Sequence, residues 1–225
     1  MMRELTLVIP AKFESESLPI FYQEIANLNC NKIVVLEETD QKTINAIENL
    51  SGLEIVFQKN KGYGSALIEG IQNTRTDFFC IINADGSMDP KYLNEMLSKM
   101  KSQNLDFLFA SRYENLGGSE DDSFVTKLGN FIFTKIGNIF FNLKITDILF
   151  TYVMGKTQNF NNLDLKSHDF TLCVEFPIKS NRKKHNIDTL PSYERKRIGG
   201  KKKVNEFKDG FLILLKMIKM YFKND

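Results

Sequence analysis

Residues 78–90, FFCIINADGSMDP, form a continuous apolar run that ends in a polar turn. The run at 78–82 has the length and composition of a strand buried on both faces. Three oxygen-bearing side chains follow at alternate positions: Asn83, Asp85 and Ser87. Oxygen ligands spaced in this way on a tight turn suit a hard divalent cation such as Mg²⁺ or Mn²⁺. An ordinary Asp-Gly turn before a helix that starts at Pro90 is the alternative for the same residues.

The sequence on both sides of this stretch alternates between short apolar runs and helical patterns. We expect strands at 5–9, 32–36, 53–57, 78–82 and 105–110. We expect helices at 17–28, 40–50, 63–73 and 90–101. This alternation indicates βαβ units and an α/β fold with a mostly parallel, doubly wound sheet. Ligands bind beyond the carboxyl ends of the strands in such sheets, so a site is expected in the loops that follow them.

The second half of the chain has longer helical patterns and a basic segment. We expect helices at 128–143 and 210–222, a polar loop at 159–167, and a helix or short strand at 171–184. From Lys179 onward there are 14 Lys and Arg against 5 Asp and Glu, so this part carries +9 and the preceding part −7. A basic segment on an acidic body suggests an anionic partner, which is phosphate, a membrane surface or nucleic acid.

Length and composition narrow the class of protein. With 225 residues, we expect one domain at 1–205 and an amphipathic helix at 206–225. Cys30, Cys80 and Cys173 form no CxxC pair, so neither a zinc site nor a disulfide framework is indicated and a cytoplasmic location fits best. The sequence has no uncharged apolar run of about 18 residues, so we expect no segment that crosses a bilayer.

Five short motifs follow the expected strands, in order along the chain. They are VIPAKFE at 8–14, LEETD at 36–40, NKGYGSAL at 60–67, NADGSMDP at 83–90 and ASRY at 110–113. This set resembles the family-two glycosyltransferases of GT-A fold, and in particular the dolichol- and polyprenyl-phosphate sugar transferases. The motifs usual in that family are V-I-P-A-x-N-E, V-D-D-G-S-x-D, N-x-G-x-G-x-A-L, D-A-D-G-x-x-D-P and G-S-R-Y.

The resemblance extends past the expected sheet, to cover about residues 4–215. IDTLP at 187–191 and RKRIGGKKK at 195–203 are similar to that family's E-V-P and R-x-x-G-x-S-K. The chain departs from the family's pattern at Asn83, where Asp is usual, and at Lys202, where Ser is usual. It also has DILFTY at 147–152 where D-x-x-S-G-F is usual.

The resemblance implies a role for each matching residue. Nucleotide-binding residues are expected to be Pro10, Ala11, Glu14, Glu37, Glu38, Lys61, Gly62, Asn83 and Ala84. Catalytic residues are expected to be Asp85, Arg112, Asp147, Arg197 and Lys203. Asp85 is expected to be the charged ligand of Mg²⁺ or Mn²⁺, with Asn83 and Ser87 as additional, neutral ligands. Only one of the adjacent Glu37 and Glu38 is expected to contact ligand. Arg112 and Arg197 are expected to bind phosphate in loops where their removal costs little fold stability.

The implied reaction is transfer of a sugar, with inversion, from a UDP- or GDP-linked donor to a polyprenyl phosphate. The alternative acceptor is a sugar hydroxyl in cell-surface polysaccharide synthesis, for which Asp147 is the expected base. Two functions from other classes compete with these. One is a nucleotidyltransferase, which shares carboxylates at strand ends. The other is nucleic-acid binding by the basic tail, which leaves the five motifs unexplained, so we expect no nucleic-acid partner.

The C-terminal helical pattern has a basic stripe on an otherwise apolar surface. Lys208, Lys216, Lys219 and Lys223 fall within about 80° when plotted at 100° per residue. This pattern is typical of an interfacial helix whose lysines reach the lipid headgroups. We therefore expect peripheral contact with the cytoplasmic face of a membrane, with the helix at 128–143 beside it. A helix packed on the core or on a second subunit is the alternative, and the oligomeric state stays open.

Overall fold

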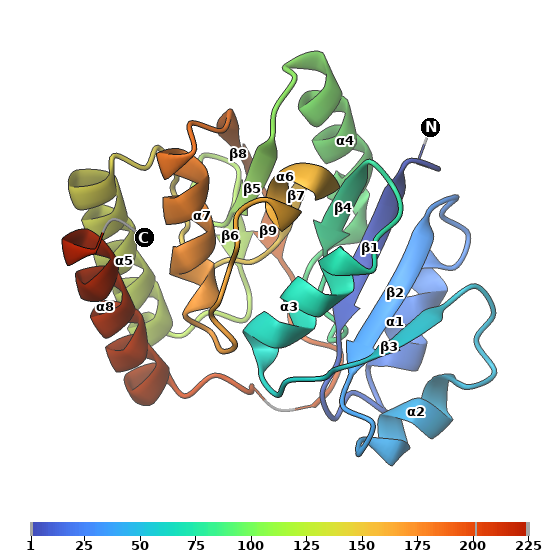
Figure 1. Ribbon diagram of the computed structural model, residues 1–225. Helices are drawn as coiled ribbons and strands as arrows, with labels where there is room; N and C mark the ends of the chain where they lie inside the picture. The colour runs from blue at the N-terminus through green and yellow to red at the C-terminus, as the bar shows by residue number, and fades with distance from the viewer. Residues whose placement is uncertain (1, 201, 224–225) are drawn as a thin grey trace.

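The computed structural model describes residues 2–200 and 202–223, and its centre is a seven-stranded sheet between helices (Figure 1). The sheet strands are β1 (Leu5–Pro10), β2 (Asn31–Leu36), β3 (Glu54–Phe57), β4 (Phe78–Ile81), β5 (Phe107–Ser111), β7 (Val153–Lys156) and β8 (Ile187–Pro191). The helices are α1 (Leu18–Ile25), α2 (Gln41–Ile47), α3 (Tyr63–Gln72), α4 (Leu93–Ser102), α5 (Phe124–Phe141), α6 (Thr157–Asn161), α7 (Leu172–Arg182) and α8 (Glu206–Phe222). A 3₁₀ turn, η1 (Pro90–Tyr92), precedes α4, and two short strands, β6 (Gly118–Ser119) and β9 (Tyr193–Glu194), pair separately.

The strand order is β3-β2-β1-β4-β7-β5-β8. All neighbours pair in parallel except at β7, which runs antiparallel to both β4 and β5. In this register Met154 of β7 lies opposite Cys80 on one side and Leu108 on the other. The predicted mostly parallel, doubly wound sheet is confirmed, and β7 and β8 are the two strands of this sheet that were not predicted from the sequence.

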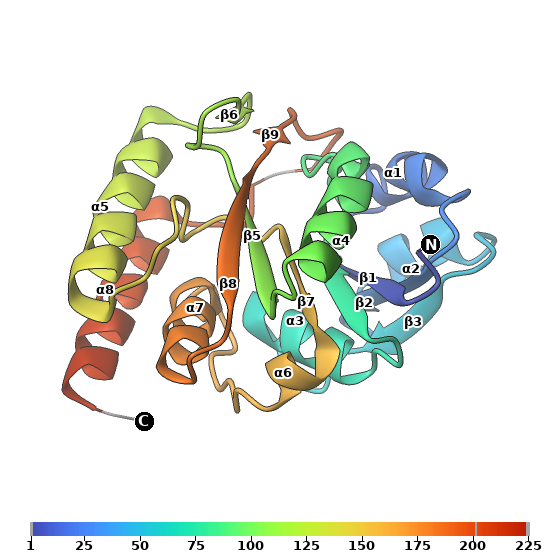
Figure 2. The ribbon, with the colours of Figure 1, turned by 90° about the horizontal axis from the view of Figure 1, so that it is seen from above.

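Successive residues of each central strand point to opposite faces, so the sheet has a core on each side. In β1, Leu7 packs in the cluster that contains Phe21 of α1 and Met96 of α4. Its neighbour Val8 packs in the other cluster, with Leu67 of α3. Figure 2 shows α1 and α4 on one side of the sheet and α3, α6 and α7 on the other. The continuous apolar runs in the sequence are therefore strands covered on both faces.

Three predictions for the second half need correction or sharpening. Residues 159–167 are not all loop, because α6 covers Thr157–Asn161. The ring of Phe160 holds this helix on the core, with its centroid 5.1 Å from that of Phe79 and 5.0 Å from that of Phe176. The uncertain segment at 171–184 is a helix, α7. Helix α5 begins at Phe124, before the predicted start, because the side chain of Ser123 caps it.

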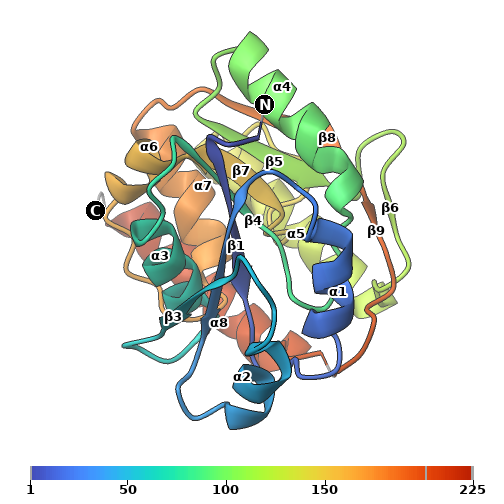
Figure 3. The ribbon, with the colours of Figure 1, turned by 90° about the vertical axis from the view of Figure 1, so that its right-hand side faces the viewer.

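Helices α5 and α8 lie side by side as an outer layer next to α7 (Figure 1). In Figure 3, α1 and α2 lie in front, at the end of the molecule opposite this helix pair. Helix α8 packs on the body through Ile213, Met217 and Met220. Lys216 belongs to the predicted basic stripe, yet its Nζ lies 3.2 Å from the carboxylate of Glu175 in α7. The helix therefore packs on the core along one face, as the alternative expected, and the stripe is turned partly inward. Within residues 2–200 and 202–223, no helix has the length and apolar character needed to cross a membrane.

Candidate active site

A cavity of 710 Å³ lies at the carboxyl ends of the parallel strands. The loops after β1, β2 and β4 meet there because parallel strands end at the same edge of a sheet. Most of the predicted site residues line this cavity: Pro10, Ala11, Glu14, Glu37, Gly62, Asn83, Ala84, Asp85, Ser87, Arg112, Arg197 and Lys203. Residues from six separate stretches of sequence are thus brought to one place.

Glu38, Lys61 and Asp147 lie outside this lining. Glu38 is exposed, whereas Glu37 lines the cavity. The Lys61 side chain is 85% exposed, and its Nζ lies 3.9 Å from the Glu37 carboxylate. Asp147 is buried against Arg112. The roles given to these three residues stay predictions.

Asp85 is held in a fixed orientation by the turn that follows β4. Its Oδ1 accepts hydrogen bonds from the Ser87 amide at 3.0 Å and the Ser87 hydroxyl at 2.8 Å. Its Oδ2 lies 3.7 Å from Nη1 of Arg197. Gly86 has a φ of 74°, and a Cβ there would lie 2.4 Å from the Ile198 side chain. The Asp-Gly turn therefore presents one carboxylate oxygen of Asp85 while Ser87 holds the other.

Asn83 is the residue that departs from the family's pattern, and it belongs to a hydrogen-bonded chain. Its Oδ1 accepts from the hydroxyl of Tyr63 at 3.1 Å, and that hydroxyl lies 2.6 Å from Oγ1 of Thr151. The Tyr63 ring stacks on Phe170, with 4.9 Å between centroids. Burial raises the pKa of Tyr63 well above its usual range, so its hydroxyl stays a proton donor. Tyr63 was not among the predicted site residues, although it lies inside one of the five motifs.

The oxygen donors at this turn fit a cation that is shared with a phosphate ligand. Among the described residues, no three His, Cys, Asp or Glu side chains are placed to hold a metal ion by themselves. Asp85 offers a charged oxygen toward the cavity, and Asn83 and Ser87 add neutral oxygens nearby. Mg²⁺ is commonly bound by one or two carboxylates together with substrate phosphates and water. A site of this composition needs further oxygen ligands, such as phosphate oxygens or water, to be complete.

The glycine at position 62 is required by the protein backbone. Its φ is 114°, and a Cβ there would lie 2.1 Å from the carbonyl oxygen of His168. The amide of Ser65 donates to the same carbonyl at 3.1 Å. Because Gly62 has no side chain, the backbone at His168 can lie against it. That segment leads to Phe170, which lines the cavity.

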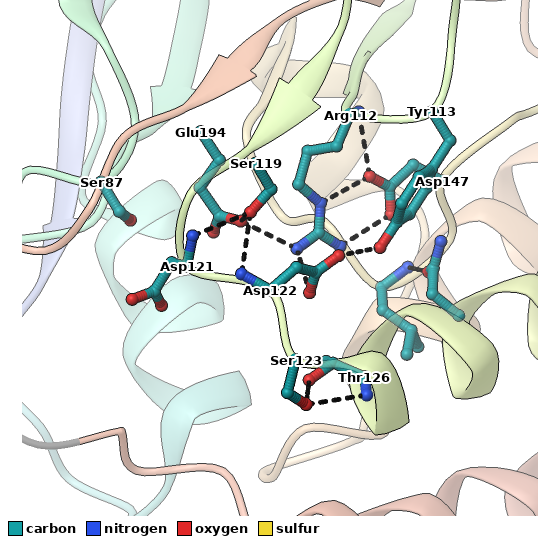
Figure 4. Close-up of polar contacts among 12 residues, drawn as sticks. Ser87, Arg112, Tyr113, Ser119, Asp121, Asp122, Ser123, Thr126, Asp147 and Glu194 are labelled. Carbon is teal, nitrogen blue, oxygen red and sulfur yellow. Dashed lines mark hydrogen bonds and ion pairs between the residues drawn. The ribbon is translucent and has the colours of Figure 1, made fainter.

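Arg112 is surrounded by three carboxylates (Figure 4). Its Nε donates to Oδ2 of Asp147 at 2.7 Å and its Nη2 to Oδ1 at 3.0 Å. Its Nη1 donates to Glu194 at 3.1 Å and to Asp122 at 3.4 Å. Burial acts to lower the pKa of Arg112, but these carboxylates outweigh it and raise the pKa well above its usual value. The guanidinium is part of a buried ion cluster and not a surface group, which corrects the expectation that its removal costs little stability.

The basic segment at 195–203 lies across the Asp85 turn. Arg197 forms a two-point ion pair with Asp121, with Nη2–Oδ2 at 2.6 Å and Nε–Oδ1 at 3.2 Å. The Ile198 amide donates to the Asp85 carbonyl at 2.8 Å. Lys203 donates to Oε1 of Glu14 at 2.9 Å. Both predicted cations therefore lie at the cavity. Lys201, the first of the three lysines that end the predicted basic motif, is outside the described residues.

The amino-terminal turns of α5 and α8 complete the wall of the cavity. Thr126 of α5 and Lys208 of α8 line it together with Lys202. Oε1 of Glu206 joins the two turns, since it accepts hydrogen bonds from Ser123 at 2.9 Å, Thr126 at 3.0 Å and Lys202 at 2.9 Å. The sequence analysis missed Thr126, Glu206, Asp121, Asp122 and Glu194.

Two curated relatives show sequence similarity to this chain over part of its length. A dolichol-phosphate mannosyltransferase of Pyrococcus furiosus is 27% identical over 133 residues, which is 56% of this chain and 38% of that protein. An uncharacterised glycosyltransferase of Mycobacterium bovis is 31% identical over 96 residues, which is 43% of this chain and 43% of that protein. The chain thus matches less than half the length of these relatives.

The solved structures that it resembles establish the fold. The glucosyl-3-phosphoglycerate synthase of Mycobacterium tuberculosis, in a complex with UDP, superposes with a TM-score of 0.75 at 15% identity, over 97% of this chain and 80% of that one. The mannosyl-3-phosphoglycerate synthase of Rubrobacter xylanophilus gives a TM-score of 0.72 at 14% identity, over 96% of this chain and 72% of that one. The predicted GT-A fold is confirmed.

The family model described as "Glycosyl transferase family 2" matches residues 6–163. This range contains all five motifs at the strand ends and most of the residues that line the cavity. The chain therefore belongs to glycosyl transferase family 2.

Proposed function

We propose that this chain transfers a hexose, with inversion, from a UDP- or GDP-linked donor to a polyprenyl phosphate at a membrane surface. One observation carries the proposal. The cavity that holds Asp85 at the sheet edge is also lined by the first turns of α5 and α8, through Thr126 and Lys208. The outer faces of those two helices are apolar, so the donor site opens beside a surface suited to lipid.

Helix α5 has the reverse of the usual polarity. Its buried residues are Asn130, Thr134 and Gly137. Its exposed side chains include Phe124 at 81% and Ile139 at 71%. Helix α8 adds more exposed apolar side chains to the same surface: Phe207, Phe211, Leu214, Leu215, Ile218, Tyr221 and Phe222. The two helices meet at Phe140 and Tyr221, whose ring centroids lie 5.6 Å apart. An exposed apolar surface of this kind marks a membrane or protein contact, and the exposed Lys219 and Lys223 of α8 favour an anionic membrane.

The donor half of the proposal rests on Asp85 and the cations around it. Asp85 would hold Mg²⁺ or Mn²⁺, with Asn83 and Ser87 as neutral neighbours, and such an ion stabilises a departing diphosphate. Arg197 and Lys203 would contact the diphosphate oxygens. One structural relative, the glucosyl-3-phosphoglycerate synthase, has been crystallised with Mn²⁺, UDP and phosphoglyceric acid. That likeness in fold supports a nucleotide diphosphate and a divalent ion at the matching strand ends here.

The choice of a phosphate as the acceptor rests on whether the reaction needs a general base. An oxygen of the acceptor phosphate attacks the anomeric carbon, the bond from that carbon to the diphosphate oxygen breaks, and the nucleoside diphosphate leaves with the electron pair. A phosphate monoester has a second pKa of about 6, so it is ionised at neutral pH and needs no base. Asp147, the expected base for a hydroxyl acceptor, accepts three hydrogen bonds from Arg112 and is poorly placed to take a proton. The dolichol-phosphate mannosyltransferase named above supports the same acceptor class.

The test measures the nucleotide product with UDP-glucose or GDP-mannose as donor. The protein is incubated with Mn²⁺ and anionic vesicles, with and without polyprenyl phosphate in the bilayer. We expect release of UDP or GDP that depends on the polyprenyl phosphate. Release of pyrophosphate would instead indicate nucleotidyl transfer. Release that follows an added soluble glycan and ignores the lipid would favour a sugar hydroxyl as acceptor.

A further inference from the structure

The ion pair between Arg197 and Asp121 has the geometry by which arginine binds a phosphate. Nη2 and Nε of the guanidinium face the two carboxylate oxygens at 2.6 Å and 3.2 Å. A carboxylate and a phosphate each offer two oxygens that match this planar fork. Both side chains are mostly buried, with exposures of 21% for Arg197 and 18% for Asp121. The pair is therefore a desolvated, two-point contact and not a loose surface pair.

This contact lies inside the proposed donor site. Arg197 and Asp121 both line the cavity, and Nη1 of Arg197 lies 3.7 Å from Oδ2 of Asp85. A diphosphate that reaches Asp85 through a shared cation must approach the same guanidinium. The Asp121 carboxylate already occupies one edge of that guanidinium. Two anions cannot both take the edge that Nε and Nη2 form, so one must leave when the other binds.

Asp121 is presented by a turn that is fixed without it. Oγ of Ser119 accepts from the amides of Asp121 at 3.1 Å and Asp122 at 3.0 Å. The same hydroxyl donates to Glu194 at 2.5 Å, and β6 pairs with β9 at this point. The turn therefore keeps its shape when the Asp121 carboxylate releases Arg197. A neutral side chain at position 121 is expected to leave the fold intact.

We propose that Asp121 occupies, on Arg197, the place of a donor phosphate, so that donor binding is an exchange of anions and Asp121 sets the affinity for the nucleotide diphosphate. This inference rests on the proposed function, because it takes the cavity to be the donor site. In the free protein the pair keeps Arg197 charged, desolvated and oriented. The donor diphosphate displaces the carboxylate, which turns back toward solvent.

The test is binding of UDP and GDP, in the presence of Mn²⁺, measured by isothermal titration calorimetry on the full chain. Asp121→Asn keeps the shape of the side chain and removes its charge. We expect Kd for the nucleotide to fall by about tenfold, equivalent to about 1.4 kcal/mol. Asp121→Glu keeps the charge and is expected not to tighten binding. Glu120→Gln is the matched control, because Glu120 is in the same turn but pairs with Tyr193 and the Lys196 amide and not with Arg197; its Kd is expected to equal that of the parent.

The sign of the change separates the exchange from an orienting role. If Asp121 served to orient Arg197 for the donor, Asp121→Asn would weaken binding, and that result would overturn the proposal. An unchanged Kd in Asp121→Asn, with the parent binding UDP or GDP, would overturn the exchange and leave the proposed function standing. A parent protein that binds neither nucleotide would overturn the proposed function, and this inference with it. Thermal melts of each variant without nucleotide check that every chain is folded.

Discussion

Helices α4 and α5 both pack on the core, yet their most buried residues are of different kinds, and the apolar Phe133, Ile136 and Phe141 of α5 are only partly buried. Helix α4 turns Leu93, Met96, Leu97 and Met100 into the core. Helix α5 turns Asn130, Thr134 and Gly137 inward and leaves Phe131 59% and Phe140 55% exposed. A surface helix normally turns its apolar side chains toward the core and its polar side chains toward water. Helix α4 belongs to the sheet half of the molecule, which is the sheet with α1 to α4, and its outer face suits water. The helix pair α5 and α8 forms the α5–α8 half, and its outer face suits an apolar contact.

The inward polar face of α5 has a structural purpose. Oδ1 of Asn130 accepts from the Leu149 amide at 3.0 Å, and Oγ1 of Thr134 accepts from the Ile148 amide at 3.2 Å. These bonds hold the loop that carries Asp147 and the cavity residue Leu149. The reversed helix thus supports the site from one side while it presents phenylalanines on the other. The two regions therefore meet at the cavity, which residues of both line.

The largest effect is expected at the junction. Arg112→Ala leaves Asp147, Glu194 and Asp122 without their cation in a buried place. Removing one partner of a buried ion cluster costs about 3–5 kcal/mol in the free energy of unfolding. Chemical denaturation measures this loss. Arg75→Ala is the control, because Arg75 is 86% exposed and lies 4.0 Å from Glu54; its effect is expected within about 0.5 kcal/mol. Equal stability of the two variants would show that the cluster does not join the two halves.

The next effect falls on the chemistry of the sheet half. Asp85→Ala removes the charged oxygen proposed to hold the cation. We expect the rate of sugar transfer to fall by at least about 100-fold, because a metal ion contributes several kcal/mol to such a transition state. Asp164→Ala, which removes a 77% exposed carboxylate paired with Lys166, is expected to act like the parent. Full turnover of the parent in excess chelator would contradict the metal assignment, whatever the variant does.

A smaller effect is expected on the outer face of the helix pair. Phe131→Glu and Phe211→Glu each place a charge on the exposed apolar surface. Each is expected to weaken binding to anionic vesicles by about 10–100-fold, since burying one such side chain contributes about 1.5–3 kcal/mol. Ile20→Glu changes a residue of α1 in the sheet half that is 55% exposed, and it is expected to leave vesicle binding unchanged. Cosedimentation at low and high salt measures all three. A loss as large in Ile20→Glu would show that the α5–α8 face is not the contact surface.

The smallest effect is the pH dependence of the contact that ties α8 to the body. Burial acts to raise the pKa of Glu175, but hydrogen bonding from Ser167 and the charges of Lys216 and Lys179 lower it to about 2. A carboxylate with a lowered folded-state pKa stabilises the protein above its unfolded value of 4.5, and this contribution is lost as the pH falls toward 2.

Glu175→Gln removes that contribution at every pH. We expect the variant to be less stable than the parent by about 1 kcal/mol at pH 7, with a smaller difference at pH 3. Urea titrations at both pH values measure it. Glu95→Gln, on the exposed side of α4, is the control. A difference that grows on acidification would have the wrong sign for this account.

The sequence predicted the sheet half well because its signals are local. Continuous apolar runs identified five strands, and most of the site residues predicted from the motifs line the cavity. Strands β7 and β8 were missed because their sequences, VMGK at Val153–Lys156 and IDTLP at Ile187–Pro191, lack the continuous apolar run that identified the other strands. The start of α5 was missed because Ser123 is a cap in a polar segment. The reversed face of α5 was visible at Asn130 and Thr134, one turn apart, which a helical projection would have placed together.

The acid partners of the site cations were beyond prediction from the sequence. Asp121 and Arg197 are 76 residues apart, and Glu14 and Lys203 are 189 apart. Nothing local marks which carboxylate a cation will meet when separate loops converge. Arg112 and Arg197 were predicted from the motifs and both line the cavity, but only the fold shows that both are already paired with acids.

The polyprenyl-phosphate acceptor is tested most directly by measuring whether the transferred sugar becomes attached to lipid. The protein is incubated with donor carrying a labelled hexose, Mn²⁺ and anionic vesicles that contain polyprenyl phosphate, and the label is measured after extraction into organic solvent. We expect label in the organic phase, in amounts equal to the nucleoside diphosphate released, and none when Asp85→Ala replaces the parent. Nucleoside diphosphate release with all of the label left in the aqueous phase would contradict a lipid-phosphate acceptor and would place the reaction on a soluble one.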